Sequence, residues 1–234
     1  EHRLSTYLSD LANPNVEYIS IKISTLFSQL NLLGWEDTLK VLGARLRKLY
    51  TSAKSHLYTR PNGQKVPKFV NLDMEEYRDL HLTVELFRRT LDDSEFFNYS
   101  AGIVLQSYLP DAFLMQRELT AWALHRVAHG GAPIKIRIVK GANLAMEKVE
   151  ASLRGWPQAP YSSKEDTDAN FKRMLAYGCR PEHAKAVHLG IASHNLFDIA
   201  YAMLLRSENN IESFTGFEML EGMADHIRRV VQAV

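Results

Sequence analysis

The feature that most constrains the fold is a regular alternation of short β-branched segments with longer stretches of helical period. Apolar residues in the longer stretches recur at i, i+3, i+4 and i+7, which is typical of amphipathic helices. The segments expected to form strands are 18–24, 68–73, 102–107, 134–139, 187–193 and 214–220. The helices expected between them lie within 37–53, 74–91, 113–128, 168–178 and 196–208. Alternation of this kind favours a parallel sheet built from βαβ units.

The number of strand segments bears on the type of sheet. Six βα units are visible and a closed barrel needs eight, so the sheet is either open and doubly wound or an incomplete barrel. An open dinucleotide-binding sheet would carry a G-x-G-x-x-G turn after its first strand, and the sequence has none. We therefore expect an incomplete α/β barrel of the (β/α)8 type. Two segments are expected to be loops, namely 59–68 around an Asn62–Gly63 turn, and 154–165.

Composition excludes several classes of partner and site. The formal net charge is +1, from 28 basic and 27 acidic residues, which gives no electrostatic footprint for nucleic acid or an anionic membrane. Cys179 is the single cysteine, so an internal disulfide and a multi-cysteine metal site are both excluded. A single cysteine fits a reducing compartment, and we expect the protein to be cytoplasmic. No apolar run reaches the roughly 20 residues that span a bilayer, and the polar start does not resemble a signal peptide.

Polar residues alternate with apolar ones inside the strand segments. In segment 18–24 isoleucines occupy one face, and Ser20, Lys22 and Ser24 occupy the other. Polar or charged residues near the ends of five segments are Lys22, Asp73, Gln106, Arg137 and His194. Active sites of barrels lie at the C-terminal ends of their strands, so these side chains form a candidate site. The alternative left open is a polar layer of paired charges inside the barrel.

The turn after segment 134–139 is a second candidate feature. Gly141 and Ala142 open a helix, so the backbone there can approach a ligand closely. Free N–H groups at a helix start suit phosphate, and Lys140 adds positive charge. An ordinary strand-to-helix turn explains the same residues.

Metal ligation is the alternative reading of the polar strand ends. Asp73, His194 and Glu218 could serve a metal-dependent barrel hydrolase. His125 and His129 have the spacing of ligands on one helix face, but Arg126 stands where the zinc motif H-E-x-x-H has glutamate. We expect no metal site. His183 is expected in a loop or at the surface, and His188 near the start of its strand.

An ordered set of segments resembles the proline dehydrogenase family, especially the barrel of the bacterial bifunctional proline utilisation A (PutA) enzymes. The resemblance covers nearly the whole chain. It is carried by ISIKIS, VNLDMEE, GIVLQSYLPDA, IKIRIVKGAN, GWPQAPYSSKEDTDANFKRML, ASHNLFDIAYAMLL and FEMLEGM. It implies a distorted (β/α)8 barrel with FAD bound across the C-terminal ends of the strands.

The resemblance implies a role for each matched residue. Arg137 resembles the arginine beside flavin N5, and Gln106 the glutamine that hydrogen-bonds the flavin ring. Lys22 resembles the lysine near the substrate carboxylate, Asp73 the aspartate that pairs with cationic groups around proline, and Glu218 a strand glutamate that partners a buried cation. The positions that match the lining of the dinucleotide part of FAD are Lys140, Gly141, Ala142, Ser193, His194 and Asn195.

The implied reaction is the FAD-dependent oxidation of L-proline to pyrroline-5-carboxylate, the first step of proline catabolism to glutamate. A hydride passes from proline C5 to flavin N5, and in the family the electrons then pass to a quinone at the membrane surface. The family resemblance also allows a fused pyrroline-5-carboxylate dehydrogenase domain and a peripheral position at the inner membrane in the parent enzyme.

The sequence departs from the family pattern in two respects. Asn143 stands where many members have tyrosine. The family's first strand and last βα unit, with an arginine pair that clamps the proline carboxylate, have no match, and Arg228 and Arg229 are expected on a solvated helix face. We therefore expect residues 1–234 to be an incomplete barrel domain that oxidises proline weakly or not at all on its own. A catalytically inactive structural piece of that barrel is the alternative.

Overall fold

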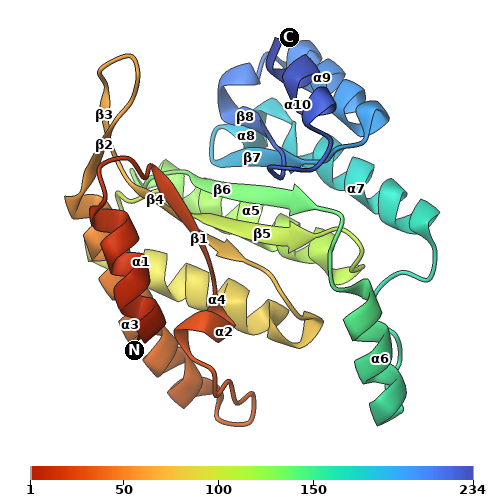
Figure 1. Cartoon of the computed structure of the whole chain (residues 1–234), viewed down its shortest axis with the longest axis horizontal. Helices are drawn as coiled ribbons and strands as arrows, with labels where there is room; N and C mark the ends of the chain where they lie inside the picture. Colours follow the sequence, from red (N-terminus) through yellow and green to blue (C-terminus); the bar gives the residue numbers. More distant parts are fainter. Residues whose placement is uncertain (1, 234) are drawn as a thin grey trace. The chain divides into compact units, whose positions relative to one another are not determined.

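The computed structural model describes residues 2–233, which form two compact units (Figure 1). The first unit comprises the residues up to Val104 together with Gly130–Ala132. The second comprises Leu105–His129 and the residues from Pro133 onward. The six long strands are hydrogen-bonded in the order β1-β4-β5-β6-β7-β8, and strand β5 (Gly102–Gln106) contributes residues to both units.

The first unit is a parallel sheet with helices. Its helices are α1 (His2–Ala12), α2 (Ile23–Leu26), α3 (Trp35–Ser55) and α4 (Leu80–Leu91), with 3-10 turns at Tyr77–Asp79 and Ser94–Phe96. Its strands are β1 (Tyr18–Lys22), β2 (Leu57–Thr59), β3 (Lys65–Pro67), β4 (Phe69–Asp73) and the start of β5. β4 pairs in parallel with β1 on one side and with β5 on the other. β2 and β3 form a separate antiparallel hairpin.

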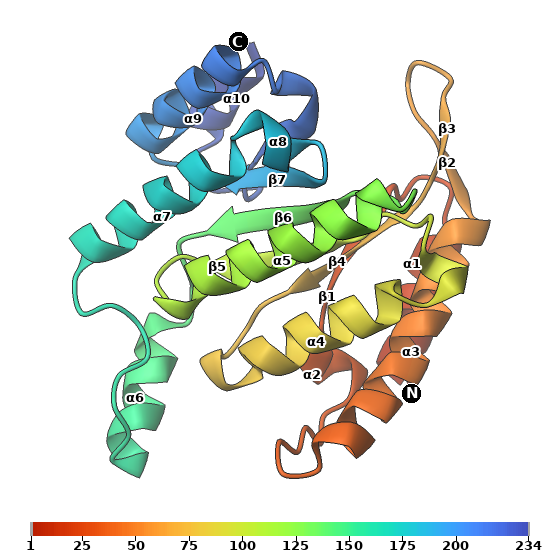
Figure 2. The ribbon, with the colours of Figure 1, turned by 180° about the vertical axis from the view of Figure 1, so that it is seen from behind.

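Helix α3 shows why these residues form a stable element. Leu42, Leu46 and Leu49 recur at helical spacing and are all fully buried, which gives the helix a continuous apolar stripe. Glu36 and Asp37 lie in its first turn and Lys54 in its last, so the charges complement the helix dipole. Helix α4 packs beside α3 in both views (Figure 1, Figure 2).

The second unit also contains parallel strands and helices. Its helices are α5 (Asp111–Ala128), α6 (Leu144–Arg154), α7 (Lys164–Gly178), α8 (Pro181–Ala184), α9 (Leu196–Asn209) and α10 (Asp225–Ala233), with a 3-10 turn at Glu212–Phe214. Its strands are the end of β5, β6 (Ile134–Val139), β7 (Val187–Ala192) and β8 (Thr215–Glu218). β7 pairs in parallel with both β6 and β8.

The strand parity predicted from the sequence is confirmed in β1 and β6. Ile134, Ile136 and Ile138 are fully buried, whereas Lys135 and Arg137 on the opposite face are half-buried. In β1 the isoleucines are likewise buried and Ser20 and Lys22 are not. The hydrophobic face therefore packs on helices and leaves the charged face of each strand for other contacts.

The six predicted βα strands are confirmed, with differences at their ends. The segment 18–24 ends as a strand at Lys22, because Ile23 begins the short helix α2. The predicted loop 59–68 contains strand β3, and its Asn62–Gly63 turn joins the β2–β3 hairpin. Helix α10 begins at Asp225, so Arg228 and Arg229 lie on a helix after β8 as expected.

The expectation that His183 is exposed was wrong. His183 lies in α8 with 9% of its surface exposed, and its ring lies 4.3 Å from that of Tyr177, centroid to centroid. Its Nδ1 is 2.8 Å from the Tyr177 carbonyl oxygen.

Cys179 is buried as a free thiol, and burial raises the pKa of this thiol to about 11. Among residues 2–233 we find no helix with the length and apolarity that a membrane span requires.

The buried stripe of α3 leads to a stability prediction. Leu42→Ala is expected to lower the free energy of unfolding by about 2–5 kcal/mol, because it leaves a cavity at a fully buried position. Leu33→Ala, at a position that is 98% exposed, is the matched control and should change it by less than about 0.5 kcal/mol. Urea unfolding of both variants measures the difference. Equal shifts for the two leucines would contradict this packing.

Candidate functional site

The first unit places Lys22 and Asp73 side by side. Their Cα atoms are register partners at the C-terminal ends of β1 and β4, so the structure brings these two predicted residues together. Asn71, on the same face of β4, donates a 3.0 Å hydrogen bond from Nδ2 to Asp73 Oδ1. Two strand ends thus present a lysine and an aspartate at one edge of the sheet.

A third residue, Glu75, joins this group and was missed by the sequence interpretation. Lys22 Nζ lies 2.7 Å from Glu75 Oε1, and Ser24 Oγ donates a 2.6 Å hydrogen bond to Glu75 Oε2. Partial burial raises the pKa of Glu75, but the hydrogen bonds from Lys22 and Ser24 outweigh it and hold the pKa below its ordinary value. Glu75 is therefore an anion that fixes the Lys22 ammonium. The sequence signal that could have identified Glu75 is its position two residues after Asp73.

In the second unit Glu218 joins two cations. Its Oε1 lies 2.7 Å from Lys135 Nζ and its Oε2 lies 2.5 Å from Arg137 Nε. The Arg137 and Glu218 side chains are only 16% and 19% exposed, so this pairing is weakly screened by water. Glu218, which the family resemblance assigns to a buried cation, thus pairs with two partly buried ones. The three side chains together carry a formal charge of +1.

Gly190 makes this ion-pair cluster possible. It is the register partner of Arg137 on β7, between β6 and β8. A Cβ atom at Gly190 would lie 2.0 Å from Glu218 Oε1 and 3.0 Å from Lys135 Cε. The Glu218 carboxylate therefore lies over the bare backbone of β7, in space that any other side chain would fill.

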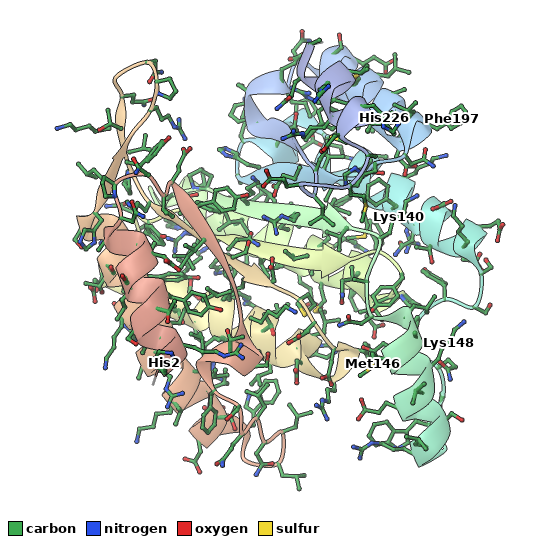
Figure 3. All side chains as sticks on the ribbon, viewed as in Figure 1. His2, Lys140, Met146, Lys148, Phe197 and His226 are labelled. Atoms are coloured by element: carbon green, nitrogen blue, oxygen red, sulfur yellow. The ribbon has the colours of Figure 1, made fainter. Side chains whose placement is uncertain are left out.

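Lys140, directly after β6 and labelled in Figure 3, is held by two carboxylates. Its Nζ lies 2.6 Å from Asp168 Oδ1 on α7 and 2.7 Å from Asp198 Oδ2 on α9. Burial lowers the pKa of Lys140, but hydrogen bonds to Asp168 and Asp198 outweigh this and raise the pKa overall. Burial likewise raises the pKa of Asp168, but Lys140 and Lys164 lower it overall. Both aspartates were missed from the sequence, where they resemble ordinary acids near helix starts.

The turn after Lys140 exposes its backbone on one side and packs on Tyr108 on the other. Gly141 is exposed and has a φ of 131°, a conformation that favours glycine. A Cβ atom there would lie 2.3 Å from the Tyr108 ring. Ala142 is exposed beside it, and Gln106 is 2% exposed at the end of β5. Burial and the Glu147 carboxylate raise the pKa of Tyr108, an effect that the Gln106 side chain partly offsets.

The residues after β7 cap the next helix. Asn195 Oδ1 accepts hydrogen bonds from the backbone N–H groups of Phe197 and Asp198, at 2.9 and 3.3 Å. Ser193 Oγ donates a 3.1 Å bond to Asp198 Oδ2. Asp198 also holds Lys140, so the structure links the turns after β6 and β7. The family resemblance implies that both turns line one ligand. Phe197, 83% exposed, lies at the start of α9 (Figure 3).

His194 has a defined tautomer. Its Nε2 accepts a 3.1 Å hydrogen bond from the Leu220 backbone N–H, so in the neutral ring the proton lies on Nδ1. That Nδ1 is buried and has no hydrogen-bond partner within residues 2–233. A buried donor without an acceptor is costly, so this N–H is suited to an acceptor atom of a ligand.

Across residues 2–233 no group of three His, Cys, Asp or Glu side chains could hold a metal ion. The rings of His125 and His129 lie 4.2 Å apart, centroid to centroid, and both residues are exposed at the end of α5.

The side chain of Arg228, which was expected on a solvated helix face, is 37% exposed. Its Nε lies 3.7 Å from Asp225 Oδ1.

The family model described as Proline dehydrogenase matches residues 2–234. A curated proline dehydrogenase of Deinococcus radiodurans is 27% identical over 220 residues, which cover 92% of this chain and 57% of that protein. Proline Utilization A (PutA) from Corynebacterium freiburgense is 48% identical, with a TM-score of 0.91 over 99% of this chain and 23% of that one. PutA from Bdellovibrio bacteriovorus, solved after inactivation by N-propargylglycine, is 31% identical, with a TM-score of 0.87 over 99% of this chain and 25% of that one.

These similarities confirm the resemblance inferred from the ordered segments. They also confirm the fold class, an incomplete α/β barrel of this type with six parallel strands. The chain spans 57% of the curated relative and about a quarter of each PutA chain. They do not test the individual site residues, which therefore remain predictions.

The Gly190 contact gives a prediction with a built-in control. Gly190→Ala is expected to lower the free energy of unfolding by about 1–3 kcal/mol, because the methyl group displaces the Glu218 carboxylate from its two cations. At Gly216, its register partner on β8, an added Cβ atom would have no other atom within 4 Å. Gly216→Ala should leave stability unchanged or slightly higher. Chemical unfolding compares the two, and equal losses would contradict the proposed crowding at Gly190.

The Lys140 cluster gives a pH-dependent prediction. Because the folded-state pKa of Asp168 is lowered, its stabilisation is present above the unfolded pKa of about 3.9 and is lost as pH falls through the folded value. The raised pKa of Lys140 sets the upper limit: stabilisation is lost as pH rises past about 10.4 and through the folded value. Asp168→Asn should therefore lower the free energy of unfolding by about 1 kcal/mol near pH 7 and by much less at either extreme.

Glu165→Gln is the control for this measurement, since Glu165 is exposed on the same helix. Denaturant unfolding at a series of pH values provides the comparison. A difference between Asp168→Asn and the unchanged chain that is constant across pH would show that the ion pairs do not carry the effect.

Proposed function

Because the chain belongs to the proline dehydrogenase family, we propose that it forms part of an FAD-dependent enzyme that oxidises L-proline to pyrroline-5-carboxylate. Residues 1–234 are the greater part of the barrel domain in this proposal. The observation that carries it is the cationic cluster of Lys135, Arg137 and Glu218, in which one carboxylate orients two cations. Such a fixed positive charge suits a cofactor that becomes anionic on reduction.

Two features of the second unit fit a flavin dinucleotide. The His194 Nδ1–H is a buried donor that lacks an acceptor within the described residues, and FAD is rich in carbonyl and phosphate acceptors. The exposed Gly141 backbone allows a cofactor to approach closely. We propose that Arg137 and Gln106 contact the flavin ring, and that Gly141, Ala142 and His194 line the rest.

The other three dinucleotide-binding candidates already have partners. Lys140 binds Asp168 and Asp198, Ser193 binds Asp198, and Asn195 caps α9. We propose that they support the cofactor mainly by holding the two turns in place. A bound phosphate would have to share Lys140 with two carboxylates, which weakens its direct attraction.

Bound flavin would supply the electron-accepting centre that takes the hydride from proline C5. The chain's own residues bind and orient the substrate. Lys22 is proposed to attract the proline carboxylate, with Glu75 keeping its ammonium group at a fixed point. Asp73, the register partner of Lys22, is proposed to pair with cationic groups around proline. A lysine and an aspartate side by side match the opposite charges of an amino acid zwitterion.

The wider context follows from the relatives. The PutA chains are about four times as long as this one, and one such structure is named as bifunctional. We propose that the parent protein carries a fused pyrroline-5-carboxylate dehydrogenase domain. We also propose that electrons pass to a quinone at a membrane surface, with the parent enzyme bound there peripherally.

Flavin titration tests the proposal directly. FAD added to the purified chain is expected to bind with a perturbed visible spectrum. Arg137→Met should weaken binding by about 10- to 100-fold, because a charge-assisted hydrogen bond contributes about 1.5–3 kcal/mol. Arg154→Met, at an exposed end of α6, should leave the Kd unchanged.

The second step is anaerobic addition of L-proline to the FAD-loaded chain. Bleaching of the flavin band would show that the described residues suffice for substrate oxidation. Flavin binding without bleaching would support the cofactor site and identify this chain as an inactive part of the barrel. A chain that binds no FAD at all would contradict the proposed function.

A further inference from the structure

Asn170 on α7 joins that helix to the loop that follows β5. It is 3% exposed, and its Nδ2 donates hydrogen bonds of 2.8 Å to the Ser107 carbonyl oxygen and 3.3 Å to the Leu109 carbonyl oxygen. Ser107 and Leu109 are themselves fully buried. A single side chain thus donates to two carbonyl groups that water does not reach, and the Leu109 carbonyl also accepts a 3.1 Å bond from the Ala112 N–H.

The orientation of the Asn170 amide is fixed by Arg173. Arg173 donates to Asn170 Oδ1 from Nε at 3.1 Å and from Nη2 at 2.7 Å. A guanidinium group only donates, so the atom that it contacts must be the amide oxygen and the NH2 group must face the loop. Arg173 is held in turn by the ring of Phe113, with 4.1 Å between the guanidinium carbon and the ring centroid.

The backbone on the other side of this loop is bonded to the end of β6. The N–H groups of Ser107 and Tyr108 donate 2.8 Å bonds to the carbonyl oxygens of Val139 and Lys140. The Tyr108 carbonyl accepts a 2.8 Å bond from the N–H of Tyr161, in the segment before α7. The loop is therefore fixed between β6 and α7, and Asn170 supplies the side-chain part of that attachment.

Two parts of the proposed flavin site, Gln106 and the Gly141 turn, depend on the position of this loop. Gln106 immediately precedes it, and the Tyr108 ring packs against the Gly141 turn. We propose that Asn170 is a positioning residue, which holds the Ser107–Leu109 loop and through it Gln106 and Tyr108 in the arrangement that receives the flavin. This inference rests on the proposed function, since the loop is assigned to flavin through Gln106.

Asn170→Asp is the sharpest test, because aspartate has the shape of asparagine but no NH2 donor. In this variant a carboxylate oxygen would face two carbonyl oxygens. The control is Asn209→Asp, since Asn209 Nδ2 also donates to a backbone carbonyl, that of Leu205, but at the partly exposed end of α9. Hydrogen exchange of the Ser107 and Tyr108 amides in the ligand-free chain reports on the loop without any cofactor.

In Asn170→Asp, both amides are expected to exchange at least about 10-fold faster, and the Kd for FAD to rise by a similar factor, since two hydrogen bonds are lost. At saturating FAD the visible circular dichroism of the bound flavin should also change, a signature that a general loss of stability would not produce. Asn209→Asp should leave all three measurements unchanged. If Asn170→Asp does not fold, Asn170→Ala, which adds no charge, carries the same expectations.

The outcomes separate the two proposals. Unchanged exchange at Ser107 and Tyr108 in a folded Asn170 variant would overturn the positioning role, whether or not the chain binds flavin. Faster exchange with an unchanged Kd and flavin spectrum would overturn the link between the loop and the cofactor. Failure of the unchanged chain to bind FAD would overturn the proposed function itself, and it is seen without any variant.

Discussion

The charged face of β6, β7 and β8 depends on one requirement: a charge held out of water needs an oppositely charged partner. Lys135 and Arg137 lie on β6, and their partner Glu218 lies on β8, with β7 between them. Neighbouring strands are about 4.8 Å apart, so the ion pairs must cross the whole width of β7. They cross it at Gly190, where a side chain would clash. The glycine on β7 and the three charged residues thus form a single interdependent arrangement.

The same requirement organises the turns beyond the strands. Lys140 at the end of β6 binds one carboxylate on α7 and one on α9, and Asp198 also accepts from Ser193 after β7. These contacts fix two strand-to-helix turns and two helices relative to one another within the second unit. Such fixed turns are what a binding site needs, since a preorganised site loses less entropy when its ligand binds. Asn170 extends the same α7 contacts to the loop after β5.

Local patterns in the sequence predicted most of the helices and strands. They missed the β2–β3 hairpin and the burial of His183. Alternation of isoleucine with charged residues identified β6 without error at either end. The β2–β3 hairpin was missed because each strand has only three residues, too few to show a period. His183 was expected in a loop or at the surface, whereas packing against Tyr177 buries it. Burial of a polar ring is decided by a neighbour six residues away, which composition does not reveal.

For the candidate site, the sequence by itself determined which cations and which aspartate stand on the polar faces of the strands, because side-chain direction in a strand alternates with a period of two. It also determined that the turns after β6 and β7 begin helices. Only the tertiary structure decided which carboxylate each cation binds. Glu218 and Arg137 are 81 residues apart in the chain, and Lys22 and Glu75 are 53 apart. Ion pairing depends on distances of a few ångströms, and strand register and helix docking set those distances.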